Sequence, residues 1–538
     1  MTLSFFQQIK KKFAQPAQYG WVALIILILA MSLRVVGIRH GDPIWIYHPD
    51  VAKQAYVAQD AFGEPYAPAK NRFRNVERAY YPYGDSVLLS DALRILQPLL
   101  NAFDLTRERL QSLHVWQWAF MLRIFSVVLF GIALVLFTLF AWPGASRWMV
   151  LTAALLLCVE PLNAQYSHYG MNDVPLAALL MLLWVASPSI RKDRGVFPWR
   201  SFLLGGLLGI AFGVKYQAVV AAIIPGMVWL LLYKEKSLCW RCLVPVVMGV
   251  GCVLGALYAC PPLRMPASFV THFPEFMAWQ ADITGEQLSL ANKISRNVVL
   301  LADYLFLQGY VLFFIPWVLF FIQARKGGWG RSTLLMGYAG AAFSACLLLV
   351  FICCRDFLRS NDMVALVPFW VWPVGLLFYG ARPVAPQKIY QHISRISYVS
   401  LCVLAVFWIT HSWRDSLALA RPDTRELARV WAVENVKAGD RILLESYTVP
   451  TRIPEVEELR VPFLAFDPLW SQVQNMEFDY LFTASLAYNR FGDNCSPYFD
   501  PEMKARYEQI DTLYERGAEF KDRELYYAHP HITVYRAR

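Results

Sequence analysis

Charged side chains are scarce in this sequence. Only 17% of its 538 residues are Asp, Glu, Lys or Arg, whereas 57% are hydrophobic. Soluble domains contain about a quarter charged residues, so this composition excludes an ordinary soluble protein and indicates a membrane protein. The 19 Trp and 27 Tyr residues agree, because these side chains favour helix ends at the lipid headgroups.

Common catalytic motifs are missing as well. The sequence has no Walker loop, no GxGxxG after a strand, no GxSxG and no HExxH. Its ten cysteines lie mostly in apolar segments, which excludes a disulfide framework. Cys239 and Cys242 form a CxxC without a second pair. Metal binding or redox chemistry by that pair stays open. Its position at the cytoplasmic edge of the membrane, without a second pair, favours a chance occurrence of the motif.

Apolar runs recur along the chain at lengths suited to about 30 Å of hydrocarbon. They predict a mostly α, polytopic membrane helix bundle with about 11 transmembrane helices. The region 201–233 is compatible with one long hairpin or two tight spans. The predicted segments are 20–38, 118–141, 148–164, 173–187, 201–214, 216–233, 242–260, 298–322, 332–352, 361–380 and 397–412.

Basic residues gather in alternate connections, which predicts the orientation. By the positive-inside rule these connections are cytoplasmic, so we expect a cytoplasmic N-terminus and, after an odd number of spans, an outside C-terminus. The net charge of +10 therefore reports topology and not nucleic-acid binding. The first segment lacks a small-residue cleavage site and is interpreted as a retained anchor. The lack of disulfides favours a bacterial inner membrane.

Two domains are predicted. Residues 1–412 form the transmembrane domain, with outside loops at about 39–117 and 261–297 that carry interfacial helices. Residues 413–538 form a small α/β domain outside the membrane, with His529-Pro530-His531 in a loop. Its expected helices are "DTRELARVWAVENV", opened by a capping box of Asp423 and Glu426, and "PEMKARYEQIDTLYERG"; its expected strands are "RILLES", "VPFLAF", "FDYLFTAS" and "HITVYRA".

Ionisable side chains in or beside the spans are candidates for a functional site, because burying them in a membrane is costly. They combine carboxylates that can accept a proton with cations that can hold a phosphate, as sugar transfer from a lipid phosphate requires. The acids are Asp50, Asp85, Asp173 and Glu160; the bases are Arg34, Arg123, Lys215, Arg355 and Arg359, with His48 and His168 beside two of the acids.

Structural roles compete with functional ones at these positions. Asp50 and Asp173 each precede a helical run, where a carboxylate caps backbone N–H groups. Arg34 and Arg123 sit where long side chains reach the headgroups, and isolated histidines are more often structural than ligands. Lys215 is at a turn between spans and has no partner nearby in the sequence. The other candidate residues near Asp50 favour a functional role for this carboxylate. For Asp173, helix capping and a functional role stay equally open.

Four stretches of the sequence resemble the GT-C superfamily of membrane glycosyltransferases, in particular the group of protein O-mannosyltransferases and the lipid A aminoarabinose transferase. The resemblance covers about residues 20–412 and depends on the order of the motifs. "RSNDMVALVPFWVWPVGLL" is a weaker, fifth match. The four stretches are "LRVVGIRHGDPIWIYHPD", "LRIFSVVLFGIALVLF", "PLNAQYSHYGMNDVPLAALLMLLW" and "GGLLGIAFGVKYQAVV".

This resemblance implies transfer of a monosaccharide from a polyprenyl-phosphate donor to a hydroxyl of a cell-envelope lipid, glycan or protein. The transfer would take place on the outer face of the membrane, with inversion. We expect Asp50 to be the catalytic base and Asp173 to align hydroxyl groups. The cations expected to stabilise the leaving phosphate are Lys215, Arg123 and Arg359. The other substrate-binding candidates are His48, His168 and Arg34.

The sequence departs from the family at one position. The acidic motif is commonly Asp-Glu, but Val51 follows Asp50 here, so a role of that Glu in metal contact or acceptor positioning does not carry over. No metal ligand is indicated, and use of a divalent metal stays open. A transporter or flippase for a lipid-linked or polar solute is the alternative function. The candidate residues gather near one face of the membrane, whereas a transport path would be lined along its length, and this asymmetry favours the enzyme.

Overall fold

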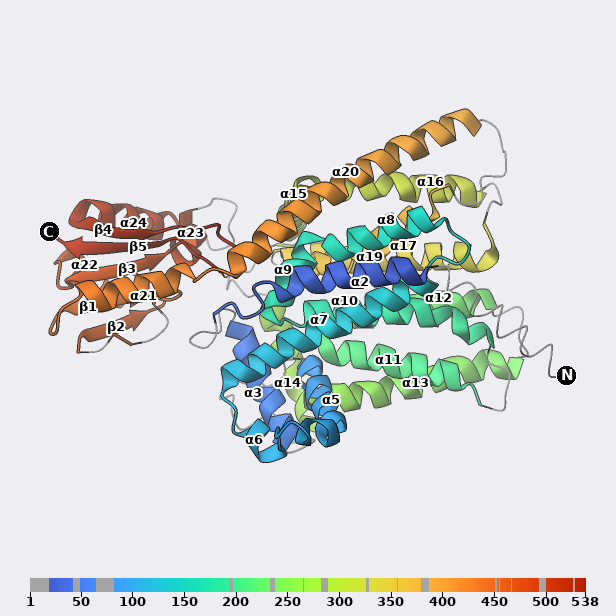
Figure 1. Cartoon of the computed structure of the whole chain (residues 1–538), viewed down its shortest axis with the longest axis horizontal. Helices are drawn as coiled ribbons and strands as arrows, with labels where there is room; N and C mark the ends of the chain where they lie inside the picture. The colour runs from blue at the N-terminus through green and yellow to red at the C-terminus, as the bar shows by residue number, and fades with distance from the viewer. Residues whose placement is uncertain are drawn as a thin grey trace. The chain divides into compact units, whose positions relative to one another are not determined.

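The computed structural model describes residues 19–41, 49–63, 82–192, 197–232, 238–264, 266–281, 289–325, 329–355, 357–378, 387–449, 452–453, 455–465, 467–492, 500–525 and 528–538. The chain divides into two compact units (Figure 1). One unit comprises Met1–Val35 and Asp50–Trp413, and the other comprises Val36–Pro49 and Arg414–Arg538.

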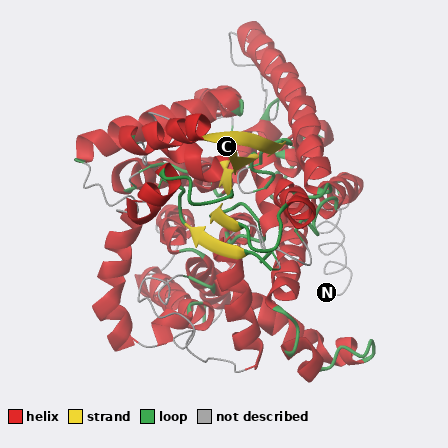
Figure 2. Ribbon diagram, turned by 90° about the vertical axis from the view of Figure 1, so that its left-hand side faces the viewer, coloured by secondary structure: helices red, strands yellow, loops and turns green. Residues whose placement is uncertain are grey.

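Figure 2 shows that helices make up most of the regular structure of the chain. The described residues of the first unit form helices joined by turns and contain no strand. Its longer elements are α2 (Gly20–Val35), α3 (Pro49–Gly63), α5 (Gly84–Asn101), α7 (Val115–Phe140), α8 (Arg147–Val159), α9 (Pro161–Tyr169), α10 (Asp173–Ala186), α11 (Trp199–Val214), α12 (Ile223–Leu232), α13 (Leu238–Ala259), α14 (Pro266–Ala281), α15 (Leu290–Leu307), α16 (Phe314–Arg325), α17 (Arg331–Cys354) and α20 (Gln387–Leu419), whose end belongs to the second unit. Shorter turns are α6 (Arg107–Gln111), η2 (Ser187–Lys192), η3 (Tyr216–Ala222), η5 (Pro261–Arg264), η6 (Tyr310–Phe313), α18 (Ser360–Val364), α19 (Val367–Val371) and η7 (Trp372–Leu376).

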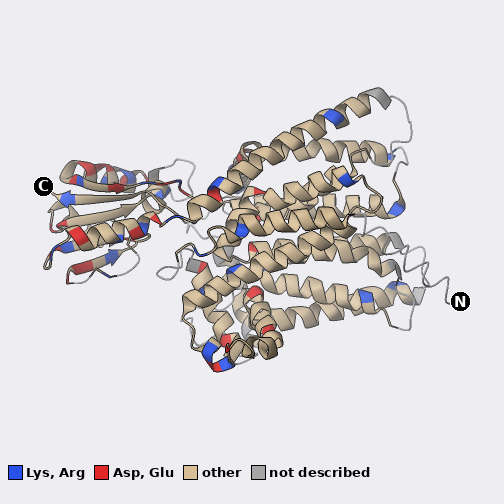
Figure 3. Ribbon diagram, viewed as in Figure 1, with Lys and Arg blue, Asp and Glu red and all other residues tan. Residues whose placement is uncertain are grey.

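This unit has the properties of a multi-pass membrane protein. Among the described residues, five helices are long and apolar enough to cross a membrane, or up to seven if each of two bent pairs is one span. Four shorter apolar helices coincide with the remaining predicted segments. Charged residues are sparse along these helices (Figure 3). On α20, Ile396, Val399 and Val403 are 60–64% exposed, as expected of side chains that face lipid. The predicted fold class is therefore confirmed, while the count of 11 spans stays a prediction.

Several predicted segments are broken helices. Segment 148–164 bends by 44° at Glu160–Pro161, since Pro161 cannot donate a helical hydrogen bond. The Glu160 carboxylate accepts the next free N–H groups, from Leu162 at 3.0 Å and Asn163 at 2.6 Å. Segment 298–322 bends by 83° near Gly309, whose φ of 74° only glycine adopts readily. The region 201–233 forms two helices, α11 and α12, joined by η3.

The second unit contains a five-stranded sheet in the order β2-β1-β3-β5-β4. Its strands are β1 (Arg441–Glu445), β2 (Glu457–Val461), β3 (Tyr480–Ala484), β4 (Tyr514–Phe520) and β5 (Ile532–Ala537). The first three run parallel, and β5 is antiparallel to both β3 and β4. The accompanying helices are α21 (Thr424–Asn435), α22 (Asp467–Gln474), α23 (Ser485–Gly492) and α24 (Pro501–Leu513).

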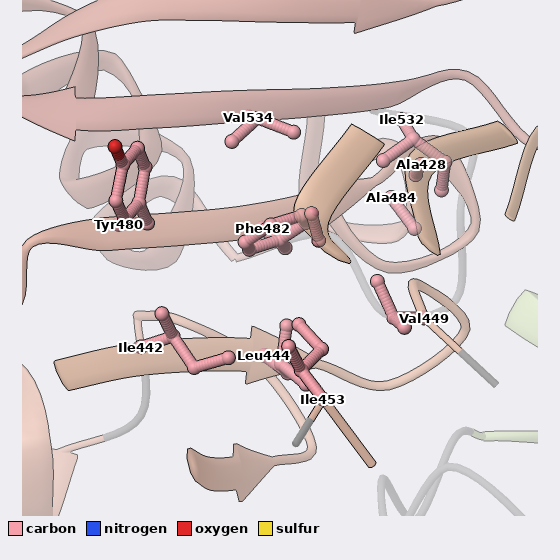
Figure 4. Close-up of a cluster of buried hydrophobic side chains, with 11 residues drawn as sticks. Ala428, Ile442, Leu444, Val449, Ile453, Tyr480, Phe482, Ala484, Ile532 and Val534 are labelled. Carbon is pink, nitrogen blue, oxygen red and sulfur yellow. The ribbon is translucent and has the colours of Figure 1, made fainter. Parts of the chain in front are cut away.

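One face of this sheet packs against α21. Ala428 from that helix lies in an apolar cluster with Ile442, Phe482 and Val534 from three strands (Figure 4). Asp423 caps the helix, and its carboxylate accepts the Arg425 N–H at 2.9 Å. The strands predicted at "RILLES", "FDYLFTAS" and "HITVYRA" thus correspond to β1, β3 and β5.

Two predictions for this unit were wrong in detail. The strand expected at "VPFLAF" lies earlier, at Glu457–Val461, where its residues pair with β1. The helix expected over "PEMKARYEQIDTLYERG" ends at Leu513, and the chain then forms the edge strand β4. Most residues of β4 are exposed or half-buried, and its sequence YERGAEF lacks the apolar signal of a strand, so pairing with β5 decides its conformation.

Candidate active site

A buried group of charged side chains lies where α10, α11 and α17 end or begin. Lys215 Nζ contacts Asp173 Oδ1 and lies 3.8 Å from Asp362 Oδ1. Arg355 Nη2 is 3.2 Å from the same Asp362 oxygen, and Asn361 Nδ2 donates to Asp173 Oδ2 at 3.2 Å. These five residues are called the Lys215 cluster below. Two cations and two carboxylates thus neutralise each other away from water, as buried charges require.

Local structure explains how residues so far apart in sequence meet. Asp173 is the first residue of α10, while Lys215 and Arg355 are the extended residues that end α11 and α17. Each position leaves the regular helix, so its side chain lies at a helix end. Asn172 connects the start of α10 to the end of α11, because its Nδ2 donates a hydrogen bond to Val214 O at 3.0 Å.

Asn297 holds the turn that carries Arg355. Its buried Nδ2 lies 3.1 Å from Ile352 O and 2.8 Å from Arg355 O, and its Oδ1 accepts the Leu358 N–H at 2.6 Å. The Tyr304 hydroxyl adds a bond of 3.3 Å to Leu358 O. Both residues belong to α15, so this helix fixes the backbone between α17 and α18.

Asp85 lies beside the Lys215 cluster. It follows Gly84, where a Cβ atom would come within 2.6 Å of Val214 N, so the start of α5 touches the end of α11. Asp85 is fully buried, and neither carboxylate oxygen has a hydrogen-bond partner of good geometry among the described residues. Burial raises the pKa of Asp85 to about 7; the Ser86 N–H opposes this rise, and the charge of Asp173 adds to it.

Gln54 is a second buried polar residue on this side of the helices. Neither of its amide atoms has a hydrogen-bond partner among the described residues. Its backbone carbonyl accepts the Ser86 hydroxyl at 2.9 Å, and Ala58 O accepts the Ser90 hydroxyl at 2.7 Å, so α3 packs against α5. Asp85 and Gln54 thus place four buried polar atoms without such hydrogen-bond partners on neighbouring turns of α5 and α3. Such atoms are uncommon in folded proteins and point to a missing ligand or water.

Asp50 lies one helical turn before Gln54, at the start of α3. Its Oδ1 accepts a hydrogen bond of 2.7 Å from Lys53 Nζ, and about a third of its side chain is exposed. Asp50 is thus the most accessible of the candidate acids, at the edge of the helix pair that carries Gln54 and Asp85.

Arg34 is buried among the helices, which argues against the alternative that its side chain reaches the headgroups. Its side chain is fully buried, and each guanidinium nitrogen donates to the protein. The acceptors include Ser167 Oγ at 3.1 Å, Cys158 O at 2.9 Å and Asn163 Oδ1 at 2.9 Å. Arg34 therefore joins the two halves of the α8–α9 break and has this structural role whether or not it also binds substrate.

The remaining candidates differ in their surroundings. Arg123 is buried beside the α9–α10 turn, where a Cβ atom at Gly170 would lie 3.1 Å from its Cγ. His168 is buried, and its Nδ1 donates to Ala164 O at 2.8 Å within α9. The Arg359 N–H donates to Asp362 Oδ2 at 3.2 Å, and its guanidinium lies 5.0 Å from the Phe357 ring centroid. His48 and the side chain of Cys239 lie outside the described residues.

Among the predicted site residues, Asp173 and Lys215 are brought into direct contact. The roles of Asp362 and Gln54 were missed, and Asp85 and Arg355 were named without a role. An acid inside the predicted apolar segment 361–380 is itself a signal, which points to Asp362. Gln54 gave no signal, because its importance depends on burial that only the packing of α3 on α5 reveals.

No protein-family model matches the sequence, and no curated protein matches it significantly. Solved structures do match it. The chain is similar to ArnT and to an archaeal oligosaccharyltransferase. ArnT from Cupriavidus metallidurans, bound to undecaprenyl phosphate, is 12% identical with a TM-score of 0.46, over 96% of this chain and 97% of that one. The apo oligosaccharyltransferase of Archaeoglobus fulgidus is 11% identical with a TM-score of 0.48, over 92% and 72%.

The same Archaeoglobus fulgidus enzyme tethered to an acceptor peptide gives 11% identity and a TM-score of 0.49, over 94% of this chain and 73% of that one. The resemblance to the GT-C superfamily therefore stays a prediction from the motifs of this sequence. At such values the likeness assigns no activity or residue role. Those assignments depend on the residues of this chain.

Proposed function

We propose that the protein transfers a monosaccharide from a polyprenyl-phosphate donor to a hydroxyl acceptor. The observation that carries this proposal is the set of unpaired buried polar atoms on Gln54 and Asp85, next to the Lys215 cluster. A sugar offers several hydroxyl groups, each of which can donate and accept a hydrogen bond. An amide and a carboxyl group without partners are suited to hold such groups in an otherwise apolar helix bundle.

Asp50 is the proposed base. Transfer forms a bond between the acceptor oxygen and the anomeric carbon while the bond to the phosphate oxygen breaks. The acceptor hydroxyl must lose its proton, and a carboxylate within hydrogen-bond reach can take it. Asp50 suits this role because its carboxylate is partly exposed and is oriented by its ion pair with Lys53. Attack opposite the departing phosphate would invert the anomeric centre.

The leaving phosphate is proposed to bind to three cations, Lys215, Arg355 and Arg359. Lys215 and Arg355 are 12–13% exposed at their side chains, so both lie at the border of the cluster. Their charges are already balanced by Asp173 and Asp362, which orients the two cations before substrate arrives. Fixed cations in a site of low dielectric stabilise developing negative charge without reorganising. Arg123 and Asp173 keep the secondary roles predicted from the motifs, in phosphate and hydroxyl binding.

The distribution of charge supports an outer-face site. Arg147 and Arg331 begin α8 and α17, at the ends of these helices away from the Lys215 cluster. The acids Asp85, Asp173 and Asp362 all lie at the cluster end. Because positive charge marks the cytoplasmic side, the cluster would face the outside of the membrane. The protein would then have a cytoplasmic N-terminus and an outside C-terminal domain, in a bacterial inner membrane.

Native mass spectrometry of the purified full chain tests this function, with wild type compared with Asp50→Asn. The substitution keeps the size of the side chain but removes the base, so bound donor should accumulate. We expect an added mass of a polyprenyl phosphate plus one sugar, more abundant in Asp50→Asn. Asp104→Asn is the matched control, because Asp104 is exposed and pairs with Arg109 at the surface.

Two other results would count against the proposal. If only ordinary phospholipid were bound, in equal amounts in wild type and Asp50→Asn, the result would contradict the transferase. A transporter or flippase would then be the better explanation. Equal donor retention in Asp50→Asn and Asp104→Asn would retain the donor site but exclude Asp50 as the base. A parallel comparison with Asp85→Asn would then show whether that buried carboxyl group takes the proton.

A further inference from the structure

Two histidines and an aspartate converge inside the second unit. His40 lies in the turn after α2, Asp423 caps α21, and His529 precedes β5. All three are buried, with at most 5% of each residue exposed. One potential ligand atom from each lies within 4.8 Å of the others, and no other group of this kind is found among the described residues. The group joins parts of the chain that are 383 and 106 positions apart.

The hydrogen bonds of the two rings fix their tautomers. His40 Nδ1 lies 2.9 Å from Leu419 O, and His529 Nε2 lies 2.8 Å from Ala418 O. A backbone carbonyl can only accept a hydrogen bond, so these two nitrogens carry the protons. In neutral rings the lone pairs therefore sit on His40 Nε2 and His529 Nδ1, and both of these atoms belong to the converging group.

The three converging atoms are all acceptors in this protonation state. His40 Nε2 is 3.2 Å from Asp423 Oδ2, and the two ring centroids are 4.9 Å apart. His529 Nδ1 is buried and has no hydrogen-bond partner among the described residues. Acceptors that face each other in a dry interior repel, and a cation between them relieves that repulsion.

The separation of His40 and Asp423 and the outer hydrogen bonds of both rings suit a metal site. Two ligands bound to Zn²⁺ at about 2.0–2.2 Å in a tetrahedral arrangement lie roughly 3.3–3.5 Å apart, close to the observed separation of His40 and Asp423. Metal-bound histidines generally donate their other ring N–H to a carbonyl or carboxylate, as both rings do here. Asp423 is held in turn by the His529 N–H at 2.8 Å and by Arg425 Nε at 2.7 Å.

We infer that His40, Asp423 and His529 bind a first-row transition metal ion of the Zn²⁺ type. Two imidazoles favour such ions, whereas Mg²⁺ and Ca²⁺ prefer oxygen ligands. Arg425 already neutralises Asp423, which further disfavours ions that depend on carboxylate charge. Because all three ligands are buried, the role is structural: the ion fastens the turn at 36–41 to α21 and to the loop before β5. This inference is independent of the proposed sugar transfer.

Zn²⁺ binding to the full-length protein in detergent tests the inference. The protein is stripped with a chelator, dialysed against Zn²⁺ and analysed for bound metal. We expect about one Zn²⁺ per chain in wild type, with affinity reduced at least about tenfold in His40→Gln and His529→Gln. His531→Gln is the matched control, since that histidine lies two residues away and contacts Tyr488 instead. Cys242→Ser controls for the CxxC pair.

Co²⁺ substitution distinguishes the sites by spectroscopy. Co²⁺ held by two imidazoles and a carboxylate gives visible d–d bands without the near-ultraviolet charge-transfer band of a thiolate ligand. No stoichiometric Zn²⁺ in wild type, or the same binding in His529→Gln, would overturn the inference. If the histidine variants do not fold, the wild-type Co²⁺ spectrum decides: a thiolate band that disappears in Cys242→Ser would assign the metal elsewhere.

Discussion

Lys215 and Asp173 are 42 positions apart in the sequence and form an ion pair at the start of α10, where both side chains are largely buried. Lys215 also lies 3.8 Å from Asp362 Oδ1, the same oxygen that Arg355 contacts at 3.2 Å. The charges of four residues, from the ends of α10, α11 and α17 and from α18, therefore balance as one network. Removing one member should disturb the others, because each neutralises a neighbour that cannot reach water.

Lys215→Met should destabilise the protein by about 3–5 kcal/mol, because it leaves the buried carboxylate of Asp173 without its cation. Thermal unfolding of the purified protein in detergent, followed by Trp fluorescence, measures this loss. Lys215→Arg should be milder for stability, since it keeps the charge, yet it should still reduce transfer activity through the altered reach of the cation.

The double variant Lys215→Met/Asp173→Asn provides the decisive comparison. If the two residues form the pair described here, their effects are not additive, and the double variant should recover about 1–3 kcal/mol relative to the sum of the single changes. Additive losses would show that the two side chains do not interact in solution.

Asp85→Asn should stabilise the protein at alkaline pH. The folded state binds the proton of Asp85 more tightly than the unfolded chain does, because burial raises its pKa to about 7 from an ordinary value of 3.8. Between these two pH values the folded state holds more protons, so stability falls as pH rises. The full shift corresponds to about 4 kcal/mol as an upper bound. We expect Asp85→Asn to melt above wild type at pH 8 and to keep only about a third of this advantage at pH 5.

Asp91→Asn is a useful control for that pH series. Asp91 belongs to the same helix but pairs with Arg94 at 2.8 Å and is 23% exposed at its side chain. Removal of this ion pair should not stabilise the protein. A flat difference between Asp85→Asn and wild type from pH 5 to 8 would mean that Asp85 is hydrated or paired in solution.

The sequence predicted the helical segments, the C-terminal sheet and the charged candidate residues of the site. Hydrophobic periodicity and a charge within an apolar run can both be read from the local sequence. Asp173 and Lys215 could be found in this way, since each interrupts an apolar run. His529 could not: its tripeptide resembles an ordinary loop, and only the sheet topology brings it to His40. Gln54 was missed for the same reason, because a single glutamine in an amphipathic helix does not reveal which side faces the interior.

Asn297→Ala should weaken the turn between α17 and α18. The variant removes the acceptor of the Leu358 N–H and the donor to Arg355 O, and each buried group left unpaired costs about 1–3 kcal/mol. Because this turn carries Arg355, activity should fall mainly in kcat while donor retention in native mass spectrometry is kept. Asn292→Ala, in the exposed first turn of the same helix, is the control. Equal effects of the two variants would contradict the role of Asn297.

Gly209→Ala should disrupt the packing of α11 on α13. A Cβ atom at Gly209 would lie 2.0 Å from Cys252 O, and one at Gly205 would lie 1.9 Å from Met248 O, so the two backbones touch through glycines spaced four residues apart. Small residues at this spacing allow membrane helices to approach closely. Since α11 ends at Lys215, separation of the helices should also displace the cluster. We expect lower thermal stability and lower activity together.

Gly249→Ala gives the matched comparison on the facing helix. A Cβ atom there has no heavy atom within 4 Å, so the change meets open space. Alanine favours a helix over glycine by up to about 1 kcal/mol, and this variant should be neutral or slightly more stable than wild type. A loss of stability in Gly209→Ala together with a gain in Gly249→Ala would thus separate the effect of backbone contact from that of helix propensity. If Gly209→Ala also proved neutral, α11 and α13 would be farther apart than the structure shows, and Lys215 would not depend on their contact.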